Sequence, residues 1–303
     1  MPISGYNFLR GVVMEVFLDD ENSSFGISGP RIQFDIQKVT NLEPNRGSIK
    51  IINLNPEKRA KLQFRDRTQL GIYGNEVRLS AGYYQDMKQI YRGNITEAIN
   101  YKRGVDWITE LECHTFIREL LTAKISRATS YPKGTRLINI VKDLLSDLGL
   151  TVTKRTKTYL QKKLGSKVIQ KSMTMQGSAA EALNRLSRNL SDYINCHITD
   201  EGIDLLPVGV ASNSVPITLS KKTGLIGTPE ITHRGIVCTH LIRHDINIST
   251  KILVISDTVE SLKTGGTYVV DKVTYRGDNR QGDFLVDIQA VYTKYDMLVP
   301  PVK

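Results

Sequence analysis

A closely spaced series of β segments occupies residues 31–95 and constrains this chain more than any other feature. It opens with RIQFDIQKV, where Ile32, Phe34 and Ile36 alternate with polar neighbours, as in a strand with one buried face. A second strand segment follows, and then NPEKRAKLQ, in which Asn55 suits a helix N-cap and the next proline the first helical position. NEVRLSAGYYQDMKQIYRGNITEAI then predicts a hairpin. Nothing in this order is typical of a catalytic centre, and it predicts a scaffold whose sheet edges pair with copies of itself.

The middle of the chain changes period and predicts a small α+β unit. In GTRLINIVKDLLSDLGL, apolar residues recur at three- and four-residue spacing. This predicts an amphipathic helix with Thr135 capping its start and Gly149 in a left-handed stop. Ser178 and Glu181 fit the capping box of a second helix. CHITDEGIDLLPVG predicts a hairpin that turns at its DEG triplet.

The period of two returns in the last third of the chain, in GIVCTHLIRHDINIS and again in QGDFLVDIQAVYT. The segment SNSVP before them is typical of a linker. We therefore predict a mainly β fold with an α+β insert. Its parts are a β domain in residues 1–122, an α+β domain in residues 123–211 and a second β domain in residues 212–303.

Most of the net charge of +10 is concentrated in one segment. Residues 151–171 carry seven basic side chains and no acidic one, and removing them leaves 10 − 7 = +3 for the rest of the chain. We expect a basic loop here and keep three hypotheses open: a solvated loop, a site for an acidic protein partner, and a nucleic-acid-binding site. Tyr159 is the only aromatic residue of the segment that could stack on a base. The candidate partner-binding residues are Lys154, Arg155, Lys157, Lys162, Lys163, Lys167 and Lys171.

No group of residues predicts catalysis, a metal site or a cofactor. Cys113, Cys196 and Cys238 are far apart and form no CxxC pair. Cys238, His240 and His244 would spread along one strand face over roughly 20 Å, whereas tetrahedral zinc holds its ligands within about 2.3 Å. HExxH, GxSxG and Walker A motifs are absent from the sequence. We therefore predict that the protein is not an enzyme and binds no cofactor.

The chain also lacks the sequence features of a membrane or exported protein. No apolar run approaches the roughly 18 to 20 residues of a membrane-spanning helix. The N-terminal MPISGYNFLRGVVMEVFLDD has neither the long apolar core nor the cleavage site of a signal peptide. We expect folding in a cytosol and no membrane insertion.

Four short motifs follow one another in a recognisable order: F-x-I-x-K, N-L before the helical turn, V-x-L-x-A-G-Y, and Y-x-G-x-I. The matching positions are Phe34, Ile36, Lys38, Asn53, Leu54, Val77, Leu79, Ala81, Gly82, Tyr83, Tyr91, Gly93 and Ile95. This order resembles phage tail hub proteins, the group of late control protein D and the N-terminal hub region of VgrG. LINIVKDLLSDLGL and MTMQGSAAEALNRLSRNLSDYINCHITDEGIDLLPVG are similar to the middle of that group, and GTYVVDKVTYRGDNRQGDFLVDIQAV is similar to its final barrel, so the resemblance spans nearly the whole chain.

The resemblance implies two tube-like β-barrel domains flanking the small α+β domain, in a structural baseplate hub of a phage or related contractile injection system. It implies a homotrimeric ring that adapts the hexameric tail tube, or a distal tail protein, to a trimeric spike that is a separate protein. The C-terminus of a tape-measure protein is a further implied partner, and DNA would only pass through the lumen during genome ejection. The implied location is the tail baseplate of the virion, after assembly in the host cytoplasm. The alternative is a basic nucleic-acid-binding protein that uses residues 151–171.

Overall fold

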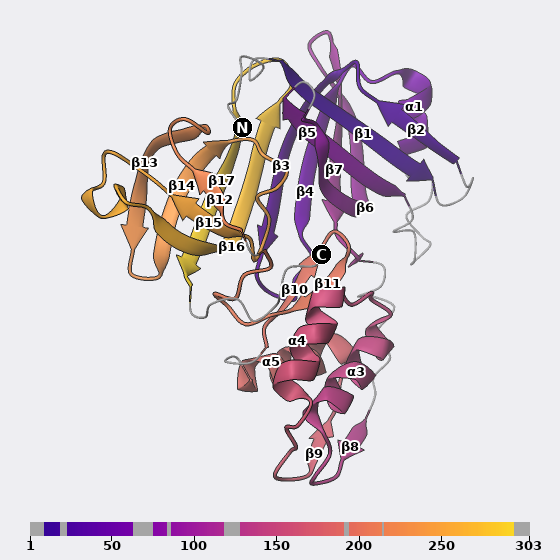
Figure 1. The fold of residues 1–303 in the computed structure, drawn as a ribbon. Coiled ribbons are helices and arrows are strands. Elements are labelled where there is room, and N and C mark those ends of the chain that lie inside the picture. The colour runs from indigo at the N-terminus through magenta and orange to yellow at the C-terminus, as the bar shows by residue number, and fades with distance from the viewer. Residues whose placement is uncertain are drawn as a thin grey trace.

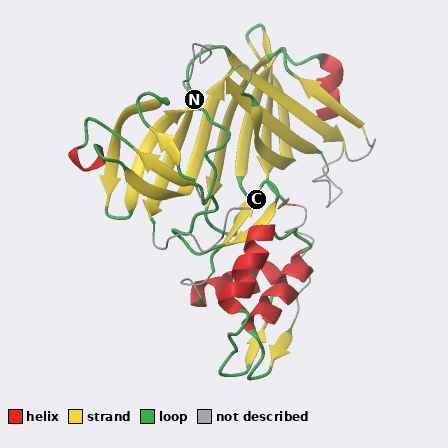
Figure 2. Ribbon diagram, in the orientation of Figure 1, coloured by secondary structure: helices red, strands yellow, loops and turns green. Residues whose placement is uncertain are grey.

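One large sheet forms the body of the molecule, and a smaller helical lobe extends from one side of it (Figure 1). Figure 2 shows most of the helices gathered in that lobe. The mainly β fold with an α+β insert, predicted from the sequence, is confirmed. The structure is a computed structural model that describes residues 9–18, 23–62, 75–83, 86–117, 128–190, 194–213 and 215–293.

The large sheet has 13 strands. They are β1 (Arg10–Leu18), β2 (Ser23–Ile27), β3 (Arg31–Val39), β4 (Arg46–Ile52), β5 (Glu76–Tyr83), β6 (Lys88–Arg103), β7 (Asp106–His114), β12 (Ile217–Leu219), β13 (Leu225–Thr232), β14 (Gly235–Leu241), β15 (Lys251–Val254), β16 (Gly266–Asp278) and β17 (Phe284–Tyr292). The main path runs β13-β14-β17-β16-β3-β4-β7-β6-β5-β1-β2, with β15 on β16 and β12 parallel to β15. A 3-10 helix, η1 (Glu260–Leu262), lies between β15 and β16.

The sheet contains the same four-stranded unit twice. The first unit consists of β3, β4, β6 and β7 in the spatial order β3-β4-β7-β6, and the second of β13, β14, β16 and β17 in the order β13-β14-β17-β16. An extra strand, β5 or β15, precedes the third strand of each unit and pairs antiparallel with the first part of it. The third and fourth strands of both units also share a register shift, between Ile95 and Glu97 in β6 and between Val270 and Lys272 in β16. The two units therefore share strand order, connectivity and a bulge.

The two units join inside one chain through β16 and β3. These strands form an antiparallel ladder from Lys272 opposite Val39 to Asp278 opposite Gln33. The core continues beneath the ladder, because the Phe284 ring lies edge-on to the Phe34 and Tyr83 rings at centroid distances of 6.1 and 5.4 Å. Buried apolar residues of both units thus belong to one cluster.

Tyr91 fills the space that two glycines leave in the first unit. Its side chain is fully buried, and its hydroxyl donates to the carbonyl of Asn45 at 3.2 Å. A Cβ at Gly47 would lie 2.7 Å from the Tyr91 ring, and one at Gly93 would lie 2.5 Å from its hydroxyl. Both positions require glycine because the ring of Tyr91 packs directly against the backbone there.

The lobe has its own apolar core, separate from that of the sheet. Helix α3 packs against α5 and α4, and the hairpin β10-β11 lies at the sheet side of the lobe (Figure 1). The hairpin predicted around the DEG triplet is confirmed. The elements of the lobe are β8 (Thr129–Tyr131), α3 (Leu137–Leu148), α4 (Lys154–Leu164), β9 (Met173–Met175), α5 (Ala179–Asn189), β10 (Cys196–Thr199) and β11 (Gly202–Leu205).

Three of the predicted helix ends are confirmed. Helix α1 (Pro56–Leu62) begins after Asn55, whose side-chain oxygen accepts from the Glu57 backbone N–H at 2.9 Å. Helix α3 ends at Gly149, which has a left-handed φ of 65°. Helix α5 begins with both hydrogen bonds of the capping box between Ser178 and Glu181.

Thr135, however, does not cap α3. The N-cap is Arg136, which makes no side-chain cap hydrogen bond. The Thr135 hydroxyl donates instead to the carbonyl of Pro132 at 2.7 Å. The prediction was wrong because a threonine next to a turn can bond that turn's own carbonyl instead of the helix.

The segment expected as a basic loop is largely a helix. Helix α4 begins after Thr153, whose hydroxyl accepts from the Thr156 backbone N–H at 3.3 Å. Tyr159, Leu160 and Leu164 are buried against the lobe. These apolar residues fix the helix by packing, and the loop prediction was wrong because it considered only the charge.

Candidate assembly surfaces

Several backbone edges of the sheet have no partner strand in the part of the chain that the structure describes. They include the outer edges of β13, β2 and β12, and one side of the last part of β6. Strand β5 pairs with β6 only over Lys88–Asn94, and the described residues place no strand beside Glu97–Arg103. Exposed apolar side chains lie on two of these edges: Ile99 of β6 is 42% exposed, and Ile226 and Ile231 of β13 are 40% and 44% exposed. Exposed apolar side chains on an open edge are typical of a surface that another chain covers.

The lobe is held to the sheet by polar contacts that are largely shielded from water. Lys38 of β3 forms a 2.6 Å ion pair with Asp200 at the tip of the β10-β11 hairpin, and its side chain is only 1% exposed. The Asn45 side chain donates to the carbonyl of Ile198 in the same hairpin at 2.8 Å. Because buried polar groups are costly to separate, these contacts fix the position of the lobe.

An ion-pair network crosses the joint between the two units. Asp278 of β16 accepts from Arg31 of β3 at 2.6 Å and from Gln33 at 2.8 Å. Burial acts to raise the pKa of Asp278, but the hydrogen bonds from Arg31, Gln33 and two backbone N–H groups outweigh it and lower the pKa to about 2. Next to it, Arg276 bonds Asp287 at 2.6 Å. The carboxylate of Asp278 therefore stays charged and links β16 to β3.

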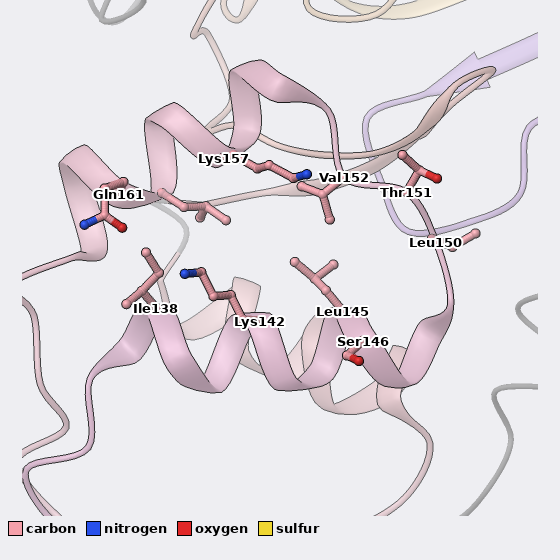
Figure 3. A pocket seen from close by; sticks show the side chains of 10 residues that line it. Ile138, Lys142, Leu145, Ser146, Leu150, Thr151, Val152, Lys157 and Gln161 are labelled. Atoms are coloured by element: carbon pink, nitrogen blue, oxygen red, sulfur yellow. The ribbon is translucent and has the colours of Figure 1, made fainter.

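A hollow of about 630 Å³ lies between α3 and α4 (Figure 3). Figure 3 shows the side chains of Lys142 and Lys157 extending into the space between the helices. Neither lysine makes an ion pair with any residue in the described ranges. The apolar residues that line the hollow are Ile138, Leu145, Leu150, Val152 and Leu160.

The basic residues predicted as a partner-binding patch are spread along α4 and the loop after it. Lys157, Lys162 and Lys171 are exposed, and Lys163 and Lys167 are half-buried. Lys154 and Arg155 belong to the first turn of α4, and their side chains lie outside the described part of the structure.

The aromatic residue of this segment is not available to a ligand. Tyr159 is only 2% exposed and belongs to the core of the lobe. Single-stranded nucleic acid is bound by positive charge together with aromatic side chains that stack on the bases. Helix α4 offers the charge without the stacking surface.

The described residues contain no cluster of three or more His, Cys, Asp or Glu that could hold a metal ion. The three cysteines are buried, and burial raises the pKa of both Cys196 and Cys238 to about 12. Burial lowers the pKa of His240 to about 4. These groups are therefore neutral parts of the packing at physiological pH. In the part of the chain described, no helix has both the length and the apolar character needed to cross a bilayer.

Comparison with known families settles the class of protein. The family model described as baseplate hub gp41 matches residues 14–290. The chain belongs to the baseplate hub gp41 family. The resemblance to phage tail hub proteins is confirmed, and the family is one of structural tail and baseplate proteins. No curated protein matches this hub protein in sequence.

Solved tail proteins share the fold of this hub protein. It is similar to a prophage MuSo2 43 kDa tail protein from Shewanella oneidensis, with a TM-score of 0.59, 9% identity and coverage of 94% of this chain and 98% of that one. A tail protein from Neisseria meningitidis MC58 gives a TM-score of 0.60 at 10% identity and covers 93% and 96%. An E. coli component of the type VI secretion system gives 0.51 at 13% identity and covers 90% and 76%. At such low identity these similarities show the fold alone.

The sequence did not reveal which residues of the hub protein would lie on free edges. Ile231 alternates with polar neighbours like a buried strand residue, and Ile99 follows the apolar Ala98, so the sequence pattern does not separate either from the core. The burial of Lys38 could have been inferred from the sequence, because its position in F-x-I-x-K places it on the same strand face as Phe34 and Ile36.

Proposed function

We propose that this baseplate hub protein assembles as a homotrimeric ring that adapts a hexameric tail tube, or a distal tail protein, to a trimeric spike. The repeated four-stranded unit carries the proposal: two units per chain would give six similar units in a trimer and only three lobes. Six similar units suit a sixfold partner on one side of the ring, and three lobes suit a threefold partner on the other.

The same arrangement suggests how the chain divides its work. We assign ring formation to two tube-like β-barrel domains, residues 1–122 and 212–303, and attachment of further tail proteins to the α+β domain, residues 123–211. The spike is then a separate protein, and the C-terminus of a tape-measure protein is a further partner. DNA passes through the lumen during ejection and is not retained. The hub is assembled in the host cytoplasm and is located in the virion tail baseplate.

The mass of the purified protein in solution and its position in the tail test this function. We expect a trimer by mass photometry, and electron microscopy of tails should show a ring on the tail axis between the tube and the spike. A protein that stays monomeric and never enters tail particles would rule the function out.

We propose no second function for α4. Aromatic side chains among the lysines would have favoured the nucleic-acid-binding hypothesis, but Tyr159, the one aromatic residue of the segment, is buried. The lysines that are exposed, such as Lys157 and Lys162, suit an acidic protein surface equally well.

A further inference from the structure

The third strand of each unit has two halves with different partners. In the second unit, the first half of β16 pairs with β15, and the second half, Lys272–Asp278, pairs with β3. In the first unit, the first half of β6 pairs with β5, while the described residues place no partner beside Glu97–Arg103. The bulges mark Thr96 and Asp271 as equivalent positions, one residue before each second half. Glu97–Arg103 is therefore the counterpart of the segment of β16 that makes the joint.

Of the first strands of the two units, only β3 is seen to receive such a joint. Strand β3 is the first strand of the first unit, and its outer edge is occupied by β16. Strand β13 is the first strand of the second unit, and β14 is its only partner among the described strands. One donor edge, on β6, and one acceptor edge, on β13, thus remain unused.

We propose that Glu97–Arg103 of β6 pairs antiparallel with β13 of a second copy of this chain, repeating the β16–β3 joint between subunits. The proposal rests on the ring proposed above and names the strands that close it. Strands β6 and β13 lie at opposite ends of the two joined units, so the contact forms between two chains (Figure 1). Because the donor and acceptor edges differ, the contact is head-to-tail, and three such contacts close a ring.

The internal joint also supplies the register. Thr232 of β13 is equivalent to Gln37 of β3, because Thr232 pairs with Gly235 in the second unit and Gln37 pairs with Arg46 in the first. The following strands of the two units are paired in the same register. A bulge between Ile226 and Glu230 has no counterpart in β3, so we transfer only the pairs on one side of it. The internal joint pairs three residues of β16 with three of β3: Thr274–Gln37, Tyr275–Ile36 and Arg276–Asp35. The equivalent pairs between subunits are, in the same order, Ile99–Thr232, Asn100–Ile231 and Tyr101–Glu230.

The exposed side chains support this register. Ile231 is 44% exposed although its cross-strand neighbour Ile236 is fully buried, and both lie on the core face. Ile99, 42% exposed, points to the opposite face from Asn100. Pairing would cover both isoleucines, one on each face of the extended sheet. No exposed large apolar residue lies in β2 or β12, the strands with competing outer edges.

A disulfide between subunits tests the register. Residues directly opposite on antiparallel strands have Cα atoms about 4.5 to 5.5 Å apart, within the range of about 4.4 to 6.8 Å that a disulfide needs. The probe is the full-length Ile99→Cys/Thr232→Cys protein under mild oxidation, with Tyr101→Cys/Glu230→Cys as a second pair in the same register. The native cysteines are buried and form no background. The control pair, Ser24→Cys/Thr232→Cys, places β2 against β13 instead.

We expect both test pairs to give a covalent trimer on non-reducing gels that reductant reverses. The yield should exceed that of the control pair by about tenfold or more, because neighbours in a closed ring react at a high effective concentration. Mixed single-cysteine chains, Ile99→Cys with Thr232→Cys, should stop at a dimer. If the protein is a trimer by mass but the test pairs do not crosslink, or if the control pair does, the proposed β6–β13 register is wrong and the proposed ring still stands. A monomer by mass would contradict the register and the ring.

Discussion

Lys38 is buried, although lysine is among the residues that are least often buried. It lies on the core face of β3, near the ring of Tyr275, and its charge is balanced by Asp200 across the joint between sheet and lobe. The sequence placed Lys38 on this face through its spacing from Ile36 but could not identify its partner. Asp200 is 162 residues away, and no local pattern connects two charges at that distance.

Separating this pair should loosen the lobe. We expect Asp200→Asn to lower the free energy of unfolding by about 3 kcal/mol, because it leaves the Lys38 ammonium buried without a counter-charge. The double variant Lys38→Met/Asp200→Asn should regain more than half of that loss, since no buried charge remains. Urea unfolding of the wild type, both single variants and the double variant gives the coupling energy of the pair.

A surface pair provides the matched control. Lys263 and Glu260 also form a short ion pair, at 2.7 Å, but both side chains are largely exposed. Glu260→Gln should change the free energy of unfolding by less than about 0.5 kcal/mol. Equal losses for Asp200→Asn and Glu260→Gln would mean that burial of Lys38 adds nothing to stability.

At the scale of elements, the strands could be predicted and one helix could not. Alternation such as Ile32, Phe34 and Ile36 reports burial on one face and needs no knowledge of the partner strand. Helix α4 also has a buried stripe, Tyr159, Leu160 and Leu164, but the lysines between these residues led to the prediction of a loop. The β16–β3 ladder was beyond sequence reasoning, because it pairs segments more than two hundred residues apart.

The close packing of Tyr91 against glycine predicts that a larger residue at Gly47 destabilises the first unit. Gly47→Ala should lower the free energy of unfolding by about 1 to 3 kcal/mol, because the new Cβ overlaps a ring that is enclosed on all sides. Gly26→Ala on β2 is the control, since its Cβ would meet no atom within 4 Å. Thermal or urea unfolding measures both, and a loss at Gly26 equal to that at Gly47 would show that overlap with the Tyr91 ring does not set the cost.

At the scale of the whole molecule, the two β units share a sheet and a core, whereas the lobe has a core of its own. Phe284 of the second unit contacts Phe34 and Tyr83 from the N-terminal half of the chain. Two domains separate in sequence therefore depend on each other for burial. We infer that the β units unfold as one cooperative body and the lobe as a second one.

The three native cysteines can show which parts unfold together, because each is buried in a different part. Cys113 lies in the first unit, Cys238 in the second and Cys196 in the lobe. Phe284→Ala removes a core ring, at a cost of about 3 to 5 kcal/mol. Thiol labelling in increasing urea, read by mass spectrometry, should then lose protection equally at Cys113 and Cys238 and less at Cys196. Leu183→Ala in the lobe should give the reverse order. Labelling of Cys238 while Cys113 stays protected in Phe284→Ala would show instead that the β16–β3 joint connects two independently folding domains.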